Sequence, residues 1–489
     1  MNEPSILSLA PVLVTLLVAL TARNVLVGLF TGVVTGVAMV TDTSVLLFVP
    51  TLVRNYIVPE VADTYNASVL VLLVFIGGFV KLIEYSGGGT AFARLATRWV
   101  AGNARAQLAA WAGGIMIFFS DLGTPLIVGP VFQPLMDRLK ISRQKLAFIL
   151  DSTSSPVAIL IPFIGWGVFI MSVIADAFSA SGVTTSEWEA FVAAIPFQLY
   201  AWLAIFMVPA LTALNFDYGP MARSETAAAK SSEFADIAEP EHHSKAKPIL
   251  VWLPLLVLGA TLFATLNHHG FPFEQVAGSD FRAGLSAAYF LAAVTIVILM
   301  VRTGVRTLLE TFTHYIEGMT GMMPIAATLV LAWALGTVSE SLGTGAYVAE
   351  VAREGLPAGL LPATTFLLAA VISFATGSSW GTIIIMMPLA VPAAIATGAP
   401  MPVVIGAVLS GGLFGDHSSP VSETTILSST GAGTTPLEHF RTQLPYAATN
   451  GVIAFTGFLV AGFFQVAWIV VPAILLQLGV LWQIRRRVS

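Results

Sequence analysis

The sequence predicts an all-α polytopic membrane protein, built from two inverted-topology repeats with re-entrant hairpins and broken transmembrane helices. Three observations predict this class: the composition, a set of long apolar runs, and a motif pattern that occurs twice. Of 489 residues, 56% are hydrophobic and 10% are charged, against about 25% charged residues in an ordinary soluble domain. The chain is therefore expected to lie in a lipid bilayer.

Apolar runs approach ~20 residues, the length that crosses the bilayer core as a helix. They are Ser5–Ala22, Val25–Met39, Val69–Leu82, Ile249–Leu266, Leu285–Val301 and Gly451–Trp482. The last run is long enough to turn back on itself. None shows the two-residue alternation of a membrane β-barrel, so the fold is expected to be helical. The chain has no cysteine and no basic tract with interleaved aromatic residues, which excludes disulfides, thiolate metal sites and nucleic-acid binding.

One polar, charged segment, Asn215–Pro248, interrupts the apolar pattern. We interpret residues 215–248 as a flexible cytoplasmic connector between a first transmembrane repeat, residues 1–214, and a second, residues 249–489. A regulatory role for the adjacent His242 and His243 is the alternative interpretation.

Two halves joined by a connector should resemble each other, and three elements recur in the same order. The matched segments, first half and then second, are Ser120–Thr124 with Ser378–Thr382, Pro130 with Pro388, and Asp151–Val157 with Asp416–Val421. The Gly-Thr pairs and the prolines have the same separation along the chain. The pattern therefore indicates an internal duplication.

The distribution of basic residues indicates that the repeats are inverted, because Lys and Arg favour cytoplasmic loops. Seven basic residues lie between Arg94 and Lys145, whereas the matching stretch of the second half has none between Arg353 and Arg441. Equivalent loops are therefore expected on opposite sides of the membrane. We expect Ser142 on the cytoplasmic side and Thr397 outside.

Two apolar stretches between basic segments, Ala106–Phe119 and Leu122–Leu135, are short for full spans. They predict a re-entrant hairpin with its tip at Ser120–Thr124, and the repeat predicts a second tip at Ser378–Thr382. Non-helical backbone at membrane depth is tolerated where it lines a cavity or is buried in protein. Transporters place their substrate and coupling ions at such discontinuous helices.

Asp151 and Asp416 each precede serines and a proline in apolar surroundings. Proline removes a backbone hydrogen bond, and hydroxyl groups either re-satisfy that backbone or turn toward a cation. Carboxylate, hydroxyl and carbonyl oxygens suit a hard cation such as sodium. We therefore predict Asp151 and Asp416 as Na+ ligands. The structural alternative is a proline kink that hydroxyl groups stabilise.

Further candidates surround these two acids. Asp121 lies at the first tip, opposite Ser379 of the second, and an ionisable residue inside a membrane is a functional candidate by default. Glu423 would share a helix face with Asp416 if the helix continued. The candidate ion- or substrate-binding residues are Asp121, Gly123, Thr124, Asp151, Ser154, Ser155, Ser378, Ser379, Thr382, Asp416, Ser418, Ser419 and Glu423.

Three nearby residues have less specific interpretations. His417 is equally compatible with a structural hydrogen bond and with proton relay. Trp166 and Trp380 are interpreted mainly as packing residues. The adjacent residues Asp416, His417 and Ser418 cannot form the geometry of a catalytic relay, and the H-E-x-x-H motif is absent. The sequence therefore predicts no enzyme and no cofactor, with Na+ as a coupling ion.

The same motifs resemble those of the NhaC-type sodium/proton antiporter family, within the ion-transporter superfamily. The resemblance is strongest at residues 415–429 and continues at residues 140–143, 150–157 and 373–382. It implies a multi-pass, sodium-coupled exchanger of a prokaryotic plasma membrane. Ser418 and Glu423 replace the Cys and Asp that are usual in the family, and the first tip lacks one of the family's acids. Members of the family also exchange organic solutes, such as malate for lactate.

Two functions follow as hypotheses. In the first, sodium and protons compete for a shared carboxylate site, which is sodium/proton antiport. In the second, sodium drives exchange of a small organic anion or amino acid that the hairpin hydroxyls and helix N-termini bind. A channel is disfavoured because hairpins that enter from both sides suggest alternating access. The solute, the stoichiometry and the oligomeric state, a homodimer included, stay open.

Overall fold

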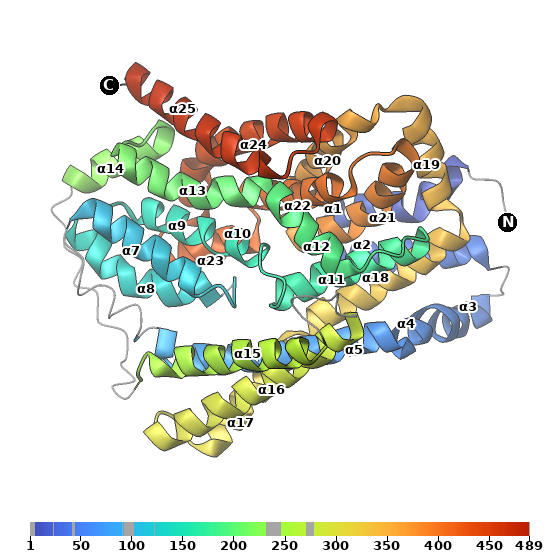
Figure 1. Ribbon diagram of the computed structural model, residues 1–489, viewed down its shortest axis with the longest axis horizontal. Coiled ribbons are helices and arrows are strands. Elements are labelled where there is room, and N and C mark those ends of the chain that lie inside the picture. The colour runs from blue at the N-terminus through green and yellow to red at the C-terminus, as the bar shows by residue number, and fades with distance from the viewer. Residues whose placement is uncertain are drawn as a thin grey trace.

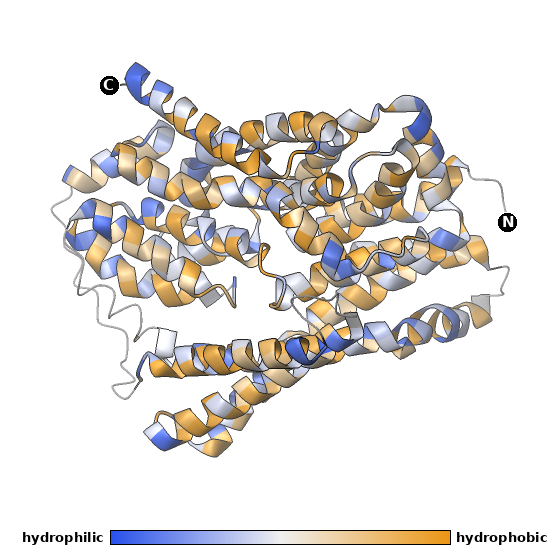
Figure 2. Ribbon diagram, viewed as in Figure 1, coloured by the Kyte–Doolittle hydropathy of each residue, from blue (hydrophilic) through white to orange (hydrophobic). Residues whose placement is uncertain are grey.

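The computed structural model describes residues 5–22, 24–41, 45–89, 91, 102–121, 123–230, 246–269 and 278–488. Within these residues the chain is helical and contains no strand (Figure 1). Eight of the described helices are long and apolar enough to cross a membrane, and the pair Glu187–Phe197 and Leu199–Leu214, bent by 45°, makes a ninth. Apolar residues line the helices, and hydrophilic ones concentrate toward the two ends of the long axis (Figure 2). The predicted helical membrane fold is confirmed.

The helices of the first half are η1 (Ile6–Leu9), α1 (Ala10–Ala22), α2 (Val25–Val40), α3 (Val45–Leu52), the π-helix η2 (Val53–Ile57), α4 (Val58–Ala62), α5 (Thr64–Tyr85), α7 (Asn103–Met116), α8 (Gly123–Arg138), α9 (Arg143–Ser152), α10 (Ser155–Ala158), α11 (Gly165–Ala180), α12 (Glu187–Ala194), η3 (Ile195–Phe197) and α13 (Leu199–Leu214). The short helix α14 (Gly219–Lys230) follows.

The second half contains α15 (Ile249–His268), α16 (Gly278–Thr303), α17 (Leu308–Gly321), α18 (Met323–Ser341), α19 (Thr344–Gly355), η4 (Ala358–Leu360), α20 (Leu361–Thr376), α21 (Ser379–Thr397), α22 (Met401–His417), α23 (Glu423–Ala432), α24 (Pro436–Phe464), η5 (Ala467–Ile469) and α25 (Val470–Val488). The long C-terminal apolar run does turn back on itself, between α24 and α25.

The packing of the two halves follows one plan. Helix α1 packs on α2 as α15 packs on α16, and α7 pairs with α8 as α20 pairs with α21. Contacts between the halves are also matched, because α23 packs on α8 as α11 packs on α21, and α18 packs on α2 as α5 packs on α16. The hairpin α7–α8 lies toward the end of the molecule that carries α14, and α20–α21 lies toward the opposite end (Figure 1). This is the arrangement of two inverted repeats with two hairpins.

Close backbone contact joins the first hairpin to the second half. A Cβ atom on Gly129 of α8 would lie 2.8 Å from the Cα atom of Gly431 in α23. Ordinary Cβ contacts are longer, so only glycine permits this approach of the two helices.

Helices α5, α15, α16 and α17 form a layer below the other helices (Figure 1). Tyr289 of α16 connects this layer to the rest of the molecule, because its hydroxyl donates a hydrogen bond to the Phe163 carbonyl at 3.0 Å.

The expectation of a flexible connector does not hold for residues 219–230, which form α14. The Met221 side chain is fully buried, and the Ser142 backbone N–H donates to the Glu225 carboxylate at 2.9 Å. One apolar anchor and one charged acceptor thus dock a segment that is otherwise polar. Four residues named above, Arg94, Leu122, His242 and His243, lie outside the described residues. The boundaries of the two repeats stay a prediction.

Candidate ion- and substrate-binding site

Both predicted helix breaks occur, and they place the two repeat-related acids alike. Asp151 is the penultimate residue of α9, and Asp416 is the penultimate residue of α22. The next helices, α10 and α23, begin at Ser155 and Glu423 after short non-helical segments. Pro156 is the second residue of α10, in the first turn, where its missing N–H costs no helical hydrogen bond.

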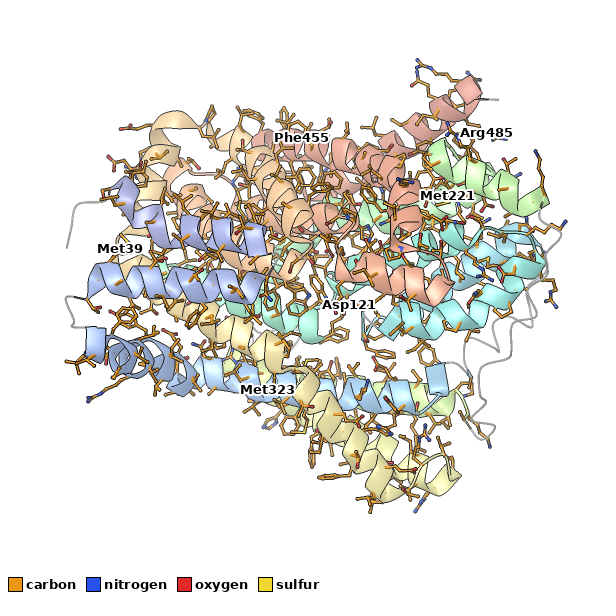
Figure 3. The ribbon with its side chains drawn as sticks, turned by 180° about the vertical axis from the view of Figure 1, so that it is seen from behind. Met39, Asp121, Met221, Met323, Phe455 and Arg485 are labelled. Atoms are coloured by element: carbon orange, nitrogen blue, oxygen red, sulfur yellow. The ribbon has the colours of Figure 1, made fainter. Side chains whose placement is uncertain are left out.

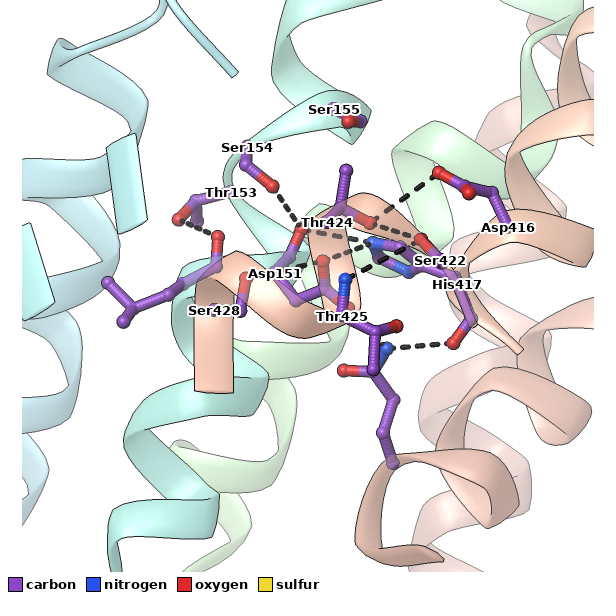
Figure 4. A network of polar contacts seen from close by, with 12 residues as sticks. Asp151, Thr153, Ser154, Ser155, Asp416, His417, Ser422, Thr424, Thr425 and Ser428 are labelled. Carbon is purple, nitrogen blue, oxygen red and sulfur yellow. Dashed lines mark hydrogen bonds and ion pairs between the residues drawn. The ribbon is translucent and has the colours of Figure 1, made fainter. Parts of the chain in front are cut away.

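Asp416 is a buried carboxylate with hydroxyl partners. It is 3% exposed, and the hydroxyls of Ser379 and Thr424 each lie 3.5 Å from its Oδ2 atom. Figure 4 shows the contact with Thr424. Ser379 comes from the second hairpin tip and Thr424 from the start of α23. Within the described part of the chain, no Lys, Arg or His side chain forms an ion pair with Asp416.

Asp151 is contacted mainly by side-chain nitrogen groups, unlike Asp416. It is fully buried, and its Oδ2 atom accepts from Gln443 Nε2 at 2.5 Å and lies 3.3 Å from His439 Nε2. His417 Nε2 lies 3.6 Å from Oδ1 and 3.0 Å from the Asp151 carbonyl (Figure 4). Ser428 donates to Oδ1 at 3.4 Å. Nitrogen groups thus surround one acid of the repeat pair, and hydroxyls contact the other.

Sequence reasoning missed His439 and Gln443. Both lie in α24 and are fully or almost fully buried. Their spacing of four residues puts them on one helix face. A polar pair at this spacing, ahead of a long apolar run, was the signal that could have identified them.

Trp166 connects the two hairpin tips. Its Nε1 atom donates to the Asp121 carboxylate at 2.7 Å, and Ser155 donates to the same oxygen at 3.3 Å. The Trp166 ring lies 4.7 Å from the ring of Trp380, at the start of α21, and Phe169 packs on Trp380 at 4.1 Å. The two tryptophans do pack, as predicted, but they pack between the tips. Asp121 lies midway between the two ends of the molecule (Figure 3).

A second acid reaches the first tip from α5, although sequence reasoning placed none there besides Asp121. The Ser120 hydroxyl donates to Glu84 Oε1 at 3.3 Å and accepts from the Gly123 N–H at 2.8 Å. Lys81 pairs with Glu84 at 3.4 Å. Since Glu84 lies in a distant part of the sequence, no local motif could reveal it.

The remaining hairpin candidates shape the backbone of the tips. Ser378 caps α21, because its hydroxyl accepts from the Gly381 N–H at 3.2 Å. Thr382 donates to the Ser378 carbonyl at 2.8 Å. Thr124 of the first tip donates to the Ile117 carbonyl at 2.9 Å. These hydroxyls stabilise the backbone of the tips, and their oxygens keep a lone pair that could contact an ion or a substrate.

The candidates at the helix breaks divide into three environments. Ser154 donates to the Asp151 carbonyl at 3.0 Å, and Ser419 accepts from the Val421 N–H at 3.4 Å. The buried Ser418 hydroxyl has no hydrogen-bond partner in the described structure. Glu423 is exposed, and because α22 ends at His417, the predicted helix face shared with Asp416 is wrong. Thr424 reaches Asp416 instead.

The structure therefore brings Asp121, Ser155, Ser379 and Asp416 to the two tips and the breaks beside them. It surrounds Asp151 with nitrogen groups from α22 and α24. In the described residues, no three His, Asp or Glu side chains gather as a metal-binding cluster. Sodium ligation by Asp151 and Asp416 stays a prediction.

Comparison with known proteins gives the family. Residues 157–463 match the Na+/H+ antiporter family. The chain belongs to this family. It is therefore a multi-pass membrane transporter of the antiporter type, in agreement with the resemblance that the motifs indicate.

Individual relatives differ in how much of the chain they match. A protein of Haemophilus influenzae, described only as uncharacterized, is 33% identical over 477 residues, 94% of this chain and 91% of that protein. The malate-2H(+)/Na(+)-lactate antiporter of Bacillus subtilis is 37% identical over 99 residues, 20% of this chain and 21% of that protein. The YdaH transporter of Alcanivorax borkumensis has a similar fold, with a TM-score of 0.62 over 88% of this chain and 91% of its own, at 15% identity.

Proposed function

We propose that the protein exchanges Na+ for H+ across the plasma membrane of a prokaryote, and that the two ions compete for Asp416. The observation that carries this proposal is the environment of Asp416, a buried carboxylate contacted by two hydroxyls at 3.5 Å. Sodium is the coupling ion in this proposal, and the protein needs no other cofactor.

The electrostatics of Asp416 explain why exchange would be obligatory. A desolvated charge without a partner costs several kcal/mol even after relaxation. Binding of either a proton or a sodium ion to Asp416 removes that cost. Because the same oxygens cannot hold both, a carrier that changes sides only when Asp416 is neutralised exchanges one ion for the other.

The neighbouring polar groups have separate roles in this proposal. Ser379 and Thr424 supply neutral oxygen ligands, while Asp121 supplies a second carboxylate at the first tip. Asp151 is a positioning residue, because Gln443 and His439 already occupy its Oδ2 atom. Its carbonyl holds His417, the neighbour of Asp416 in the chain.

A second candidate function is sodium-coupled exchange of a small organic solute. One observation favours it: Trp166, Phe169 and Trp380 form an aromatic cluster beside the Asp121 carboxylate. Apolar walls with a few polar groups are typical of small-molecule sites. The relative that exchanges malate and lactate matches a fifth of the chain.

The test uses purified protein in liposomes that contain a proton-sensitive dye. Addition of sodium outside should release protons from wild type in the absence of any organic solute. Asp416→Asn should abolish the signal, since asparagine keeps the shape but cannot titrate or carry charge. Glu354→Gln, which removes an exposed acid of α19 outside the site, is the matched control and should exchange normally.

Two results decide between the candidates. Exchange that begins only after a particular organic solute is supplied would refute ion-only antiport and establish the second function. Normal sodium/proton exchange by Asp416→Asn would show that this carboxylate has only a structural role.

A further inference from the structure

A cavity of about 350 Å³ opens between α11, α18, α19 and α21. Its polar lining includes Asp176, Ser339, Glu340, Thr344 and Arg353. Helices α19 and α21 extend to the end of the molecule opposite α14 (Figure 1). The basic loops predict that this end faces outside, so we call this the outer cavity.

Asp176 is the unusual residue of the outer cavity. It lies in the apolar helix α11, and within the described structure its carboxylate forms no hydrogen bond and no ion pair. A Cβ atom on Gly336 of α18 would lie 2.7 Å from Asp176 Oδ2, so a glycine makes room for this carboxylate. Glu60 and Glu340 are close enough to act on it electrostatically. An ionisable group in such a helix is a functional candidate by default.

A second, independent feature is the Ser339 hydroxyl, which has no hydrogen-bond partner in the described structure. Ser339 is 8% exposed and lines the outer cavity. A buried hydroxyl without a partner is destabilising. The oxygen itself is shielded in this conformation, so rotation of the side chain toward the cavity would let water or an ion supply the missing partner.

The outer cavity lies on the helices that form the central site. Trp166 and Asp176 are both in α11, and a separation of ten residues corresponds to about 15 Å along a helix. Helix α21 likewise begins with Trp380 at the second tip and lines the cavity with Pro388 and Pro392. The outer cavity and the two tips therefore share the helices α11 and α21.

The repeat-related helices at the other end, α8 and α23, leave no such space between them. Helices α8 and α23, which correspond to α21 and α11, contact each other through the backbones of Gly129 and Gly431. No side chain lies between the helices at that point. In the described structure, the counterpart of the outer cavity is therefore absent from this position, although a separate cavity of about 830 Å³ lies at the same end, lined by α8, α9, α14 and the start of α24.

We propose that the outer cavity is a vestibule that concentrates sodium ions for the central site, with Asp176 and Glu340 as its cation-attracting groups. This inference rests on the proposed function for the identity of the ion. A volume of about 350 Å³ holds roughly ten waters at about 30 Å³ each, so sodium keeps much of its hydration here. Arg353 offsets one of the two acids, so the lining keeps an excess of one negative charge. An excess of acid in a cleft raises the local cation concentration and the rate of binding, here by about tenfold.

The test uses the absence of cysteine from the natural chain. Ser339→Cys is introduced alone, and the protein is labelled in sealed vesicles with membrane-impermeant thiol reagents of positive or negative charge. We expect labelling from the outside, about tenfold faster with the cationic reagent. Sodium should slow this labelling relative to choline at the same ionic strength.

Asp176→Asn, added to Ser339→Cys, should reduce both the preference for the cationic reagent and the protection by sodium. It should also raise the external sodium concentration that half-saturates exchange, with little change in the maximal rate. Glu340→Gln on the exposed rim should have the same effects if Asp176→Asn does not fold. Glu354→Gln, which removes a nearby acid outside the cavity, should have none of them.

Equal labelling by both reagents, or labelling that sodium does not slow, would overturn the proposal. Protection by an organic amine and not by sodium would also overturn it and assign the cavity to a different solute. Labelling does not require transport, so the measurement is repeated with Asp416→Asn. Sodium protection that persists in Asp416→Asn would show that the vestibule attracts sodium independently of the central site. Sodium protection of Ser339→Cys together with an absence of sodium/proton exchange by wild type would support the vestibule while the proposed function failed.

Discussion

The two repeat-related aspartates should respond in opposite ways when their charge is removed. In Asp151→Asn, the groups that surround the acid lose a charged acceptor. In Asp416→Asn, a buried charge disappears from a place where only hydroxyls contact it at 3.5 Å. The first substitution should destabilise the protein, and the second should leave its stability unchanged or increase it.

The magnitudes follow from the contacts. Hydrogen bonds to a charged group contribute about 1.5–3 kcal/mol each, and Asp151 Oδ2 accepts from Gln443 and lies 3.3 Å from His439. Asparagine keeps one oxygen acceptor, so we expect a loss of about 2–3 kcal/mol. Contacts of 3.5 Å are at the limit of hydrogen bonding, so Asp416→Asn loses little and saves a desolvation cost of about 1–3 kcal/mol.

Thermal unfolding in detergent, without sodium, measures the difference. At about 2 °C per kcal/mol, Asp151→Asn should lower the Tm by about 5 °C, whereas Asp416→Asn should leave it unchanged or raise it by a few degrees. Adding sodium in place of choline should stabilise wild type, by about 2.7 kcal/mol at a hundred times the Kd. This stabilisation should be absent from Asp416→Asn and present in Asp151→Asn.

Equal destabilisation by both substitutions would refute the reasoning, because it would mean that Asp416 is also held by strong partners. Sodium stabilisation that survives in Asp416→Asn would place the ion elsewhere. Glu354→Gln serves again as the control for loss of one acid, and its Tm should equal that of wild type.

Three further predictions test the fold around the site. Cysteines at Arg138 and Thr397 should be labelled only from the cytoplasm and only from outside, respectively, and labelling of both from one side would contradict the inverted repeats. Burial raises the pKa of Glu225, so docked α14 takes up a proton more readily than undocked α14, and docking should weaken as the pH rises through that pKa. Hydrogen exchange of residues 219–230, corrected for its intrinsic pH dependence, should show this weakening in wild type and not in Glu225→Gln. Gly431→Ala should cost about 1–3 kcal/mol because its Cβ has no space against the first hairpin, while Gly479→Ala, which meets no atom within 4 Å, should be neutral or gain up to about 1 kcal/mol.

Much of the fold was predictable because membranes restrict the choice of structure. Apolar runs of spanning length had to be helices, since no other open structure satisfies its backbone in lipid. The prolines after Asp151 and Asp416 marked the two helix breaks, and both acids end their helices as the repeat predicted. The same local logic failed at Glu423, because it assumed that α22 continued beyond His417.

Contacts between distant segments were not predictable in this way. Glu84, His439 and Gln443 reach the site from α5 and α24. The spacing of His439 and Gln443 indicates a shared helix face, but nothing in the sequence says that this face meets Asp151. The docked helix α14 was equally hidden, because one buried Met221 and one hydrogen bond from Ser142 decide its position.

The sequence by itself determined the class of protein, the two inverted repeats, the hairpin tips and the pair of aspartates, because composition, charge and motif spacing are properties of the chain. Only the tertiary structure decided that the two aspartates are unlike. Repeat symmetry gives Asp151 and Asp416 the same place in their helices, but α24 brings His439 and Gln443 to Asp151 alone. The free energy of a buried charge depends on its neighbours in space, so the difference between an acid held by nitrogen groups and an acid contacted by hydroxyls arises only when the helices pack.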